Sequence, residues 1–145
     1  MGKARELQQV AVESLPRLFA VEGVAQAVSE SVASVRRKLN DGRLPVVRFA
    51  GEGRGSRLFV RSRTSRFEPL SAAEAAHLAA ATLTMKKAGV PAFLKVSTVA
   101  RLLRVHPAYV REKLIAAGRL KAVQWAEGGA YFIPLESYLS FFANI

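Results

Sequence analysis

The stretch VEGVAQAVSESVASVRRKLNDGRLPVVRFA, residues 21–50, decides the fold, because much of it recurs as VSTVARLLRVHPAYVREKLIAAGRLKAVQWA at residues 96–126. When one extra residue is allowed in the second copy before Gly118, twelve of thirty aligned positions are identical. The identities include the Gly-Arg-Leu of residues 42–44 and 118–120. A repeat of this length marks one structural unit per copy. The sequence therefore predicts two small units rather than one larger domain.

The first copy predicts two short helices separated by a polar break. Val24, Ala25 and Val28 recur at the spacing of one helix face, and Val35 and Leu39 lie four residues apart on the next. The second copy has apolar residues in the same pattern: Val99, Ala100, Leu102, Leu103, Val110 and Leu114. Each copy is therefore expected to begin as a helix-turn-helix.

The residues at the helix ends support this assignment. Ser31 is suited to cap the second helix of the first copy, and Pro107 after His106 suits the first helical position in the second copy. Gly42 and Gly118 follow these helices, and glycine readily takes the positive φ that ends a helix. We expect each second helix to stop at its glycine.

A hairpin is predicted after each glycine. The runs LPVVRFA and RLFVR flank GEGRGS at residues 51–56, and LKAVQWA and AYFI flank EGG at residues 127–129. Strand-forming residues around a glycine turn are typical of a hairpin, and the first one is rich in arginine. GEGRGS is a poor nucleotide-binding loop, because it lacks the GK[ST] ending, has Ser56 in place of a third glycine and precedes a strand.

These features resemble the winged helix-turn-helix domains of phage excisionases and MerR-like regulators. The resemblance covers residues 19–64 and 93–145, and the second copy continues to an isoleucine-proline entry into a last helix, FIPLESYLSFF. It implies an α+β fold, mainly α with small β-hairpins, of two winged helix-turn-helix domains joined by a helix. The expected parts are an N-terminal extension at 1–18, a first domain at 19–66, a linker helix at 67–92 and a second domain at 93–145.

The linker is expected to be one helix over residues 71–89. Ser71 and Glu74 form a capping-box pattern, the run is rich in alanine, and Gly89 stands at its end. A helix of this length spans about 28 Å, which suits a spacer between recognition helices in adjacent major grooves about 34 Å apart. The same helix could also be the last helix of the first domain. The segment from Ala4 to Val12 favours one more short helix.

The resemblance also implies which residues contact DNA. The second helix of each unit would enter the major groove, where arginine can fork to guanine, and the wing would hold phosphates. In the first copy the implied residues are Ser31, Ser34, Arg36, Arg37, Arg43, Arg48, Arg54 and Arg57, with Arg61 or Arg63 as further candidates. In the second copy they are His106, Tyr109, Arg111, Lys113 and Arg119. The alternatives are an ordinary solvated face for the arginines and packing for Tyr109.

Composition favours an anionic partner. The 22 Lys and Arg against 11 Asp and Glu give a net charge of +11, which attracts nucleic acid, although a plain basic surface or an acidic protein partner remain alternatives. The chain has no cysteine and no apolar run long enough to span a bilayer, so we expect a cytoplasmic, nucleoid-associated protein without a membrane partner. His77 and His106 stand apart without cysteine, so no metal, cofactor or enzymatic activity is expected.

The expected function is sequence-specific binding to double-stranded DNA by a bacterial or mobile-element transcription regulator. One alternative is an excisionase-type directionality factor that bends DNA. An alternative of another class is a protein-interaction adaptor in which only the first domain binds DNA. The apolar tail residues either close the second core or form a face for a homodimer or protein partner: Tyr138, Leu139, Phe141, Phe142 and Ile145.

Overall fold

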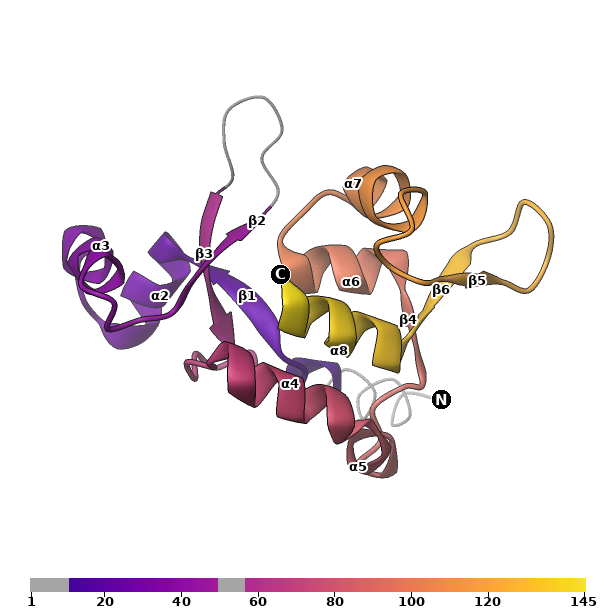
Figure 1. Cartoon of the computed structure of the whole chain (residues 1–145), viewed down its shortest axis with the longest axis horizontal. Helices are drawn as coiled ribbons and strands as arrows, with labels where there is room; N and C mark the ends of the chain where they lie inside the picture. The colour runs from indigo at the N-terminus through magenta and orange to yellow at the C-terminus, as the bar shows by residue number, and fades with distance from the viewer. Residues whose placement is uncertain (1–10, 50–56) are drawn as a thin grey trace.

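The computed structural model describes residues 11–49 and 57–145 and has mixed helices and strands, with two small antiparallel sheets of three strands each (Figure 1). This confirms the α+β class. In the first half, residues 11–91, the repeated unit consists of β1 (Arg17–Ala20), α2 (Val21–Val28), α3 (Val32–Asn40), β2 (Val46–Phe49) and β3 (Arg57–Ser62). In the second half, residues 92–145, it consists of β4 (Phe93–Lys95), α6 (Val96–Leu103), α7 (Pro107–Tyr109), η1 (Val110–Ile115), β5 (Val123–Gln124) and β6 (Tyr131–Pro134).

The two units have the same topology. The sheet orders are β1-β3-β2 and β4-β6-β5, so the last strand is central in both. Ala20 pairs with Phe59 in the first sheet, and Lys95 pairs with Phe132 in the second, which fixes the structural equivalence of the two copies. The turn between the first two helices is left-handed in both, at Ser29 with φ 54° and at Arg104 with φ 58°.

The extra residue of the second copy is absorbed by a π-helix. In the first half, the Asp41 N–H donates to the Arg37 carbonyl four residues earlier. In the second half, the Ala116 N–H donates across 3.0 Å to the Arg111 carbonyl five residues earlier. A one-residue insertion commonly widens a helix in this way, and the buried Val110 and Leu114 keep their places on the core.

The prediction of one continuous helix over residues 71–89 is wrong. The segment forms α4 (Ala72–Ala80) and α5 (Thr82–Lys87), which meet at Ala81. Thr82 is buried, and its hydroxyl donates across 2.6 Å to the Ala79 carbonyl, a back-bond that often bends helices. The capping box of Ser71 and Glu74 is present. α4 packs along α8 (Leu135–Asn144), so it is part of the core (Figure 1).

One hydrophobic core joins the two halves. Phe49 of β2 makes edge-on ring contacts with Tyr109 and Phe141 of the second half, at centroid distances of 6.0 Å and 5.8 Å. The tail helix α8 closes this core with Leu135, Tyr138, Leu139, Phe141 and Phe142, all buried. Its large apolar side chains are therefore covered within the chain and do not form the open dimer face that the sequence left as an alternative. The predicted domain boundaries stay predictions.

Candidate functional site

Arg36 and Arg37 lie on the solvent face of α3. The opposite face buries Val35 and Leu39 against α2 and β3, as the spacing predicts. Both arginines are exposed. Within residues 11–49 and 57–145, neither guanidinium has a hydrogen bond or ion pair. These two cations are therefore available for an external anion.

The two serines of α3 have structural roles. The Ser31 hydroxyl accepts a hydrogen bond of 3.1 Å from the Ser34 N–H and caps the helix. The Ser34 hydroxyl donates across 2.6 Å to Glu30, which also forms an ion pair with Lys38. The hydrogen bond from Lys38, and then that from Ser34, lowers the pKa of the Glu30 carboxyl. This network fixes the start of α3 and neutralises Lys38.

The basic residues after α3 differ in whether an acidic side chain neutralises them. Arg43 is exposed but forms an ion pair of 2.8 Å with Asp41. Arg48 and Arg57 are exposed on β2 and β3, and Arg57 pairs in register with the buried Phe49, so the two arginines lie on opposite faces of the sheet. Arg54 lies outside the described residues. The hairpin therefore contributes Arg48 and Arg57 as cations that no described acidic group neutralises.

Two arginines suggested as phosphate contacts have other partners. Arg61 is 5% exposed, and its guanidinium donates to the carbonyls of Phe142 and Ile145 at the end of α8. The suggestion for Arg61 is wrong, because strand alternation placed it on the face that the second half covers. Arg63 forms an ion pair of 3.1 Å with Glu74.

Most of the residues proposed for DNA contact in the second half have interactions within the chain. The His106 Nδ1 accepts a hydrogen bond of 3.0 Å from the Ala108 N–H, so this imidazole caps α7. Tyr109 is half-buried against Phe49, which matches the packing alternative. Arg119 stacks 5.4 Å from the centre of the Phe141 ring. Arg111 and Lys113 are exposed on η1.

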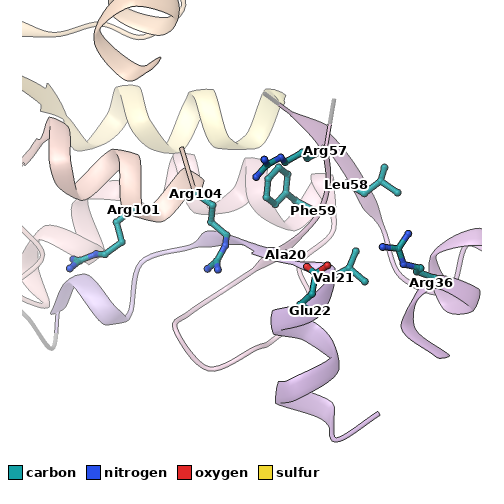
Figure 2. A pocket seen from close by; sticks show the side chains of 9 residues that line it. All are labelled: Ala20, Val21, Glu22, Arg36, Arg57, Leu58, Phe59, Arg101 and Arg104. Atoms are coloured by element: carbon teal, nitrogen blue, oxygen red, sulfur yellow. The ribbon is translucent and has the colours of Figure 1, made fainter. Parts of the chain in front are cut away.

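A basic cleft lies between the halves (Figure 2). Its volume is about 700 Å³, and its walls come from the start of α2, the face of α3, strand β3 and helix α6. The lining residues are Ala20, Val21, Glu22, Arg36, Arg57, Leu58, Phe59, Arg101 and Arg104. The described lining residues thus include four arginines and one carboxylate, that of Glu22. We call this the arginine cleft.

The second half has an equivalent groove of about 610 Å³. Val96, Arg111 and Phe132 line it at the places that Val21, Arg36 and Phe59 occupy in the arginine cleft. The remaining lining residues are Lys95, Ser97, Gln124, Gly128, Gly129, Ala130 and Tyr131. The repeat therefore builds one kind of groove twice, and the first copy is the more basic.

Sequence reasoning missed Arg101 and Arg104. Arg101 lies on the first helix of the second copy and Arg104 directly follows it, and the resemblance assigns this helix to packing. The local signal is only that they flank the buried pair Leu102 and Leu103 and so face away from the core. The packing of the second half against β1 brings them to the first half's groove.

In the described part of the chain, no three His, Cys, Asp or Glu side chains gather where a metal ion could bind. Of the helices that the structure describes, none has the length and apolar character needed to cross a membrane. No protein-family model, curated protein or solved structure matches this chain.

Proposed function

We propose that this chain is a sequence-specific double-stranded DNA-binding protein made of two winged helix-turn-helix units, acting as a bacterial or mobile-element transcription regulator. The observation that carries the proposal is the pair Arg36 and Arg37, which have no side-chain partner among the described residues and lie on the exposed face of a capped helix beside the arginine cleft. Arginine donates two hydrogen bonds to guanine O6 and N7, the commonest base-specific contact in the major groove.

The surrounding charge supports the same function. The chain carries +11, and a field of this sign attracts DNA and speeds association at low salt. Arg57 lines the same cleft as Arg36 and would hold phosphates while α3 contacts bases, and Arg48 is a further exposed cation on the other face of the hairpin. Phosphate contacts position a protein on the duplex, and base contacts supply specificity.

The two units are expected to contact unlike half-sites. Arg36 of α3 corresponds to Arg111 of η1, but the π-helix and Glu112 change the helix surface around Arg111. Because the copies differ, the preferred site is asymmetric or contains two unequal direct half-sites. A palindromic site would instead require two chains.

The test is selection from a random duplex library, repeated over a salt series, for the wild type and for the double variant R36A/R37A. We expect an enriched motif for the wild type and its loss in the variant. The control is R66A/K87A, which removes two exposed positive charges outside the arginine cleft. A wild type that enriches no motif would refute the proposal, as would an R36A/R37A variant that selects the same motif with the same affinity.

One observation favours a second function, protein docking by the second half. Trp125 is 65% exposed and contacts the rings of Phe93 and Phe132, at centroid distances of 5.3 Å and 4.2 Å. Its equivalent in the repeat is Phe49, which is buried between the halves. The second half therefore exposes a face that the first half covers with protein, as an adaptor would.

The variant R111A/K113A separates the two functions. If the second unit contacts DNA, this variant loses affinity and one part of the selected motif. If the second unit is a docking module, R111A/K113A keeps the DNA affinity and the selected motif of the wild type. A substitution of Trp125 then leaves DNA binding unchanged as well.

A further inference from the structure

We infer that Arg101 and Arg104 of α6 extend the DNA-binding surface across the junction of the two halves and hold backbone phosphates of the duplex that α3 contacts. The inference rests on the proposed function and adds to it. The helix-turn-helix resemblance assigns no DNA contact to α6. The inferred contact would make the two halves one continuous DNA-binding surface rather than two units on a spacer.

The packing of α6 fixes where these side chains point. Val99, Leu102 and Leu103 of α6 are fully buried, so Arg101 lies on the outer face of the helix, and Arg104 follows the helix as its C-cap residue. Both are exposed. Figure 2 shows them on one side of the arginine cleft, with Arg36 on the other side. The cleft thus combines cations from α3, β3 and α6.

The charges in the cleft are not balanced. Within the part of the chain that the structure describes, Arg36, Arg57, Arg101 and Arg104 have no hydrogen bond or ion pair. Among the described residues that line the cleft, Glu22 carries the one carboxylate. Like charges gathered in this way repel one another and weaken the fold unless an anion offsets them. A row of phosphates supplies that anion.

The turn after α6 fixes where Arg104 lies. Arg104 is the C-cap residue of α6 and has φ 58°, a left-handed conformation that ends the helix. The equivalent Ser29 has φ 54°, so the turn requires this conformation in both copies. The turn therefore holds Arg104 at the wall of the arginine cleft.

The openness of the cleft favours a duplex backbone over a small phosphate compound. Pockets for small ligands bury most of the ligand and place a few polar groups within an apolar lining. Here the four guanidinium groups are all on exposed residues from three separate elements. The equivalent groove of the second half also contains two basic residues, Lys95 and Arg111, so a second basic groove is present there.

The test compares the full-length wild type with R101A/R104G, using the duplex selected by the wild type and a salt series. We expect the variant to bind that duplex about tenfold more weakly, with the slope of log affinity against log salt reduced by about two and the selected motif unchanged. The charge-matched control R66A/K87A should keep the wild-type slope. The R36A/R37A variant, in contrast, should lose the motif.

The outcomes separate the two proposals. If R101A/R104G keeps the wild-type slope while R36A/R37A loses the motif, the inference fails and the proposed function stands. If titration calorimetry shows that inorganic pyrophosphate binds the wild type but not R101A/R104G, and the DNA slope is unchanged, a small phosphate compound is the ligand and the inference fails. R101Q alone, a change on the helix surface, should lower the slope by about one if the double variant does not fold.

Discussion

The Tyr138 hydroxyl donates a hydrogen bond of 2.6 Å to the carbonyl of Pro16, a residue 122 positions earlier in the chain. Both residues are buried. The bond links the last helix of the second half to the segment that enters β1. Burial raises the pKa of the Tyr138 hydroxyl well above its ordinary value, and nearby Arg17 only partly opposes this effect. The two halves are therefore joined by a specific polar contact as well as by the shared core.

Replacing Tyr138 with phenylalanine should destabilise the protein by about 1–2 kcal/mol at neutral pH, because the buried Pro16 carbonyl loses its donor. The difference should shrink above pH 10.0, the ordinary pKa of tyrosine. Above that pH, Tyr138 ionises in the unfolded wild type but stays protonated in the folded protein. The free energy of unfolding of the wild type therefore falls as pH rises, whereas Y138F lacks this hydroxyl and does not show this fall. Denaturant unfolding of both proteins at neutral and alkaline pH measures the effect. A constant difference across that range would contradict it.

Replacing Arg61 with methionine should destabilise the protein by about 2–3 kcal/mol, because its hydrogen bonds to the carbonyls of Phe142 and Ile145 come from a charged group. DNA affinity should not change, since Arg61 is buried beneath α8. The matched control is R63M, which removes only the exposed pair with Glu74 and should cost less than about 1 kcal/mol. Chemical denaturation that shows equal losses of unfolding free energy for R61M and R63M would contradict this prediction, because the buried hydrogen bonds of Arg61 would then stabilise the protein no more than an exposed ion pair.

Replacing Glu22 with glutamine should tighten DNA binding about twofold at low salt, because it removes a negative charge from the arginine cleft. The gain should disappear at high salt as the interaction is screened. Glu68 is exposed and does not line the cleft, so E68Q is the control and should leave affinity unchanged. Weaker DNA binding by E22Q than by the wild type in a fluorescence titration would contradict the proposal that backbone phosphates lie along the arginine cleft.

The two helix-ending glycines should each be sensitive to alanine. Gly42 and Gly118 have φ values of 74° and 75°, and an added Cβ would meet no atom within 4 Å, so the cost is conformational and about 1–2 kcal/mol each. Gly23 is the contrasting case. It lies within α2, where a Cβ would make an ordinary contact with Phe19, so G23A should stabilise by about 0.5–1 kcal/mol. Thermal unfolding of the three variants tests the opposite signs.

Local features of the sequence determined the repeated unit. The i, i+4 pairs Val35 with Leu39 and Val110 with Leu114 mark the buried faces of the second helices, and Gly42 and Gly118 end them with a positive φ. Ser31 caps its helix as expected. These features depend on residues within a few positions of one another, so a sequence displays them directly.

Longer-range contacts decided the rest. The sequence did not predict that the halves share a core, that Arg61 is buried under α8, or that Arg101 and Arg104 line the cleft beside Arg36. It shows which faces are apolar or charged, but several partners satisfy a hydrophobic face equally well. The choice among them depends on side-chain shapes that fit only in three dimensions. The sequence thus determined two helix–helix–hairpin units with exposed arginines, and only the tertiary structure decided that their packing gathers those arginines into one cleft.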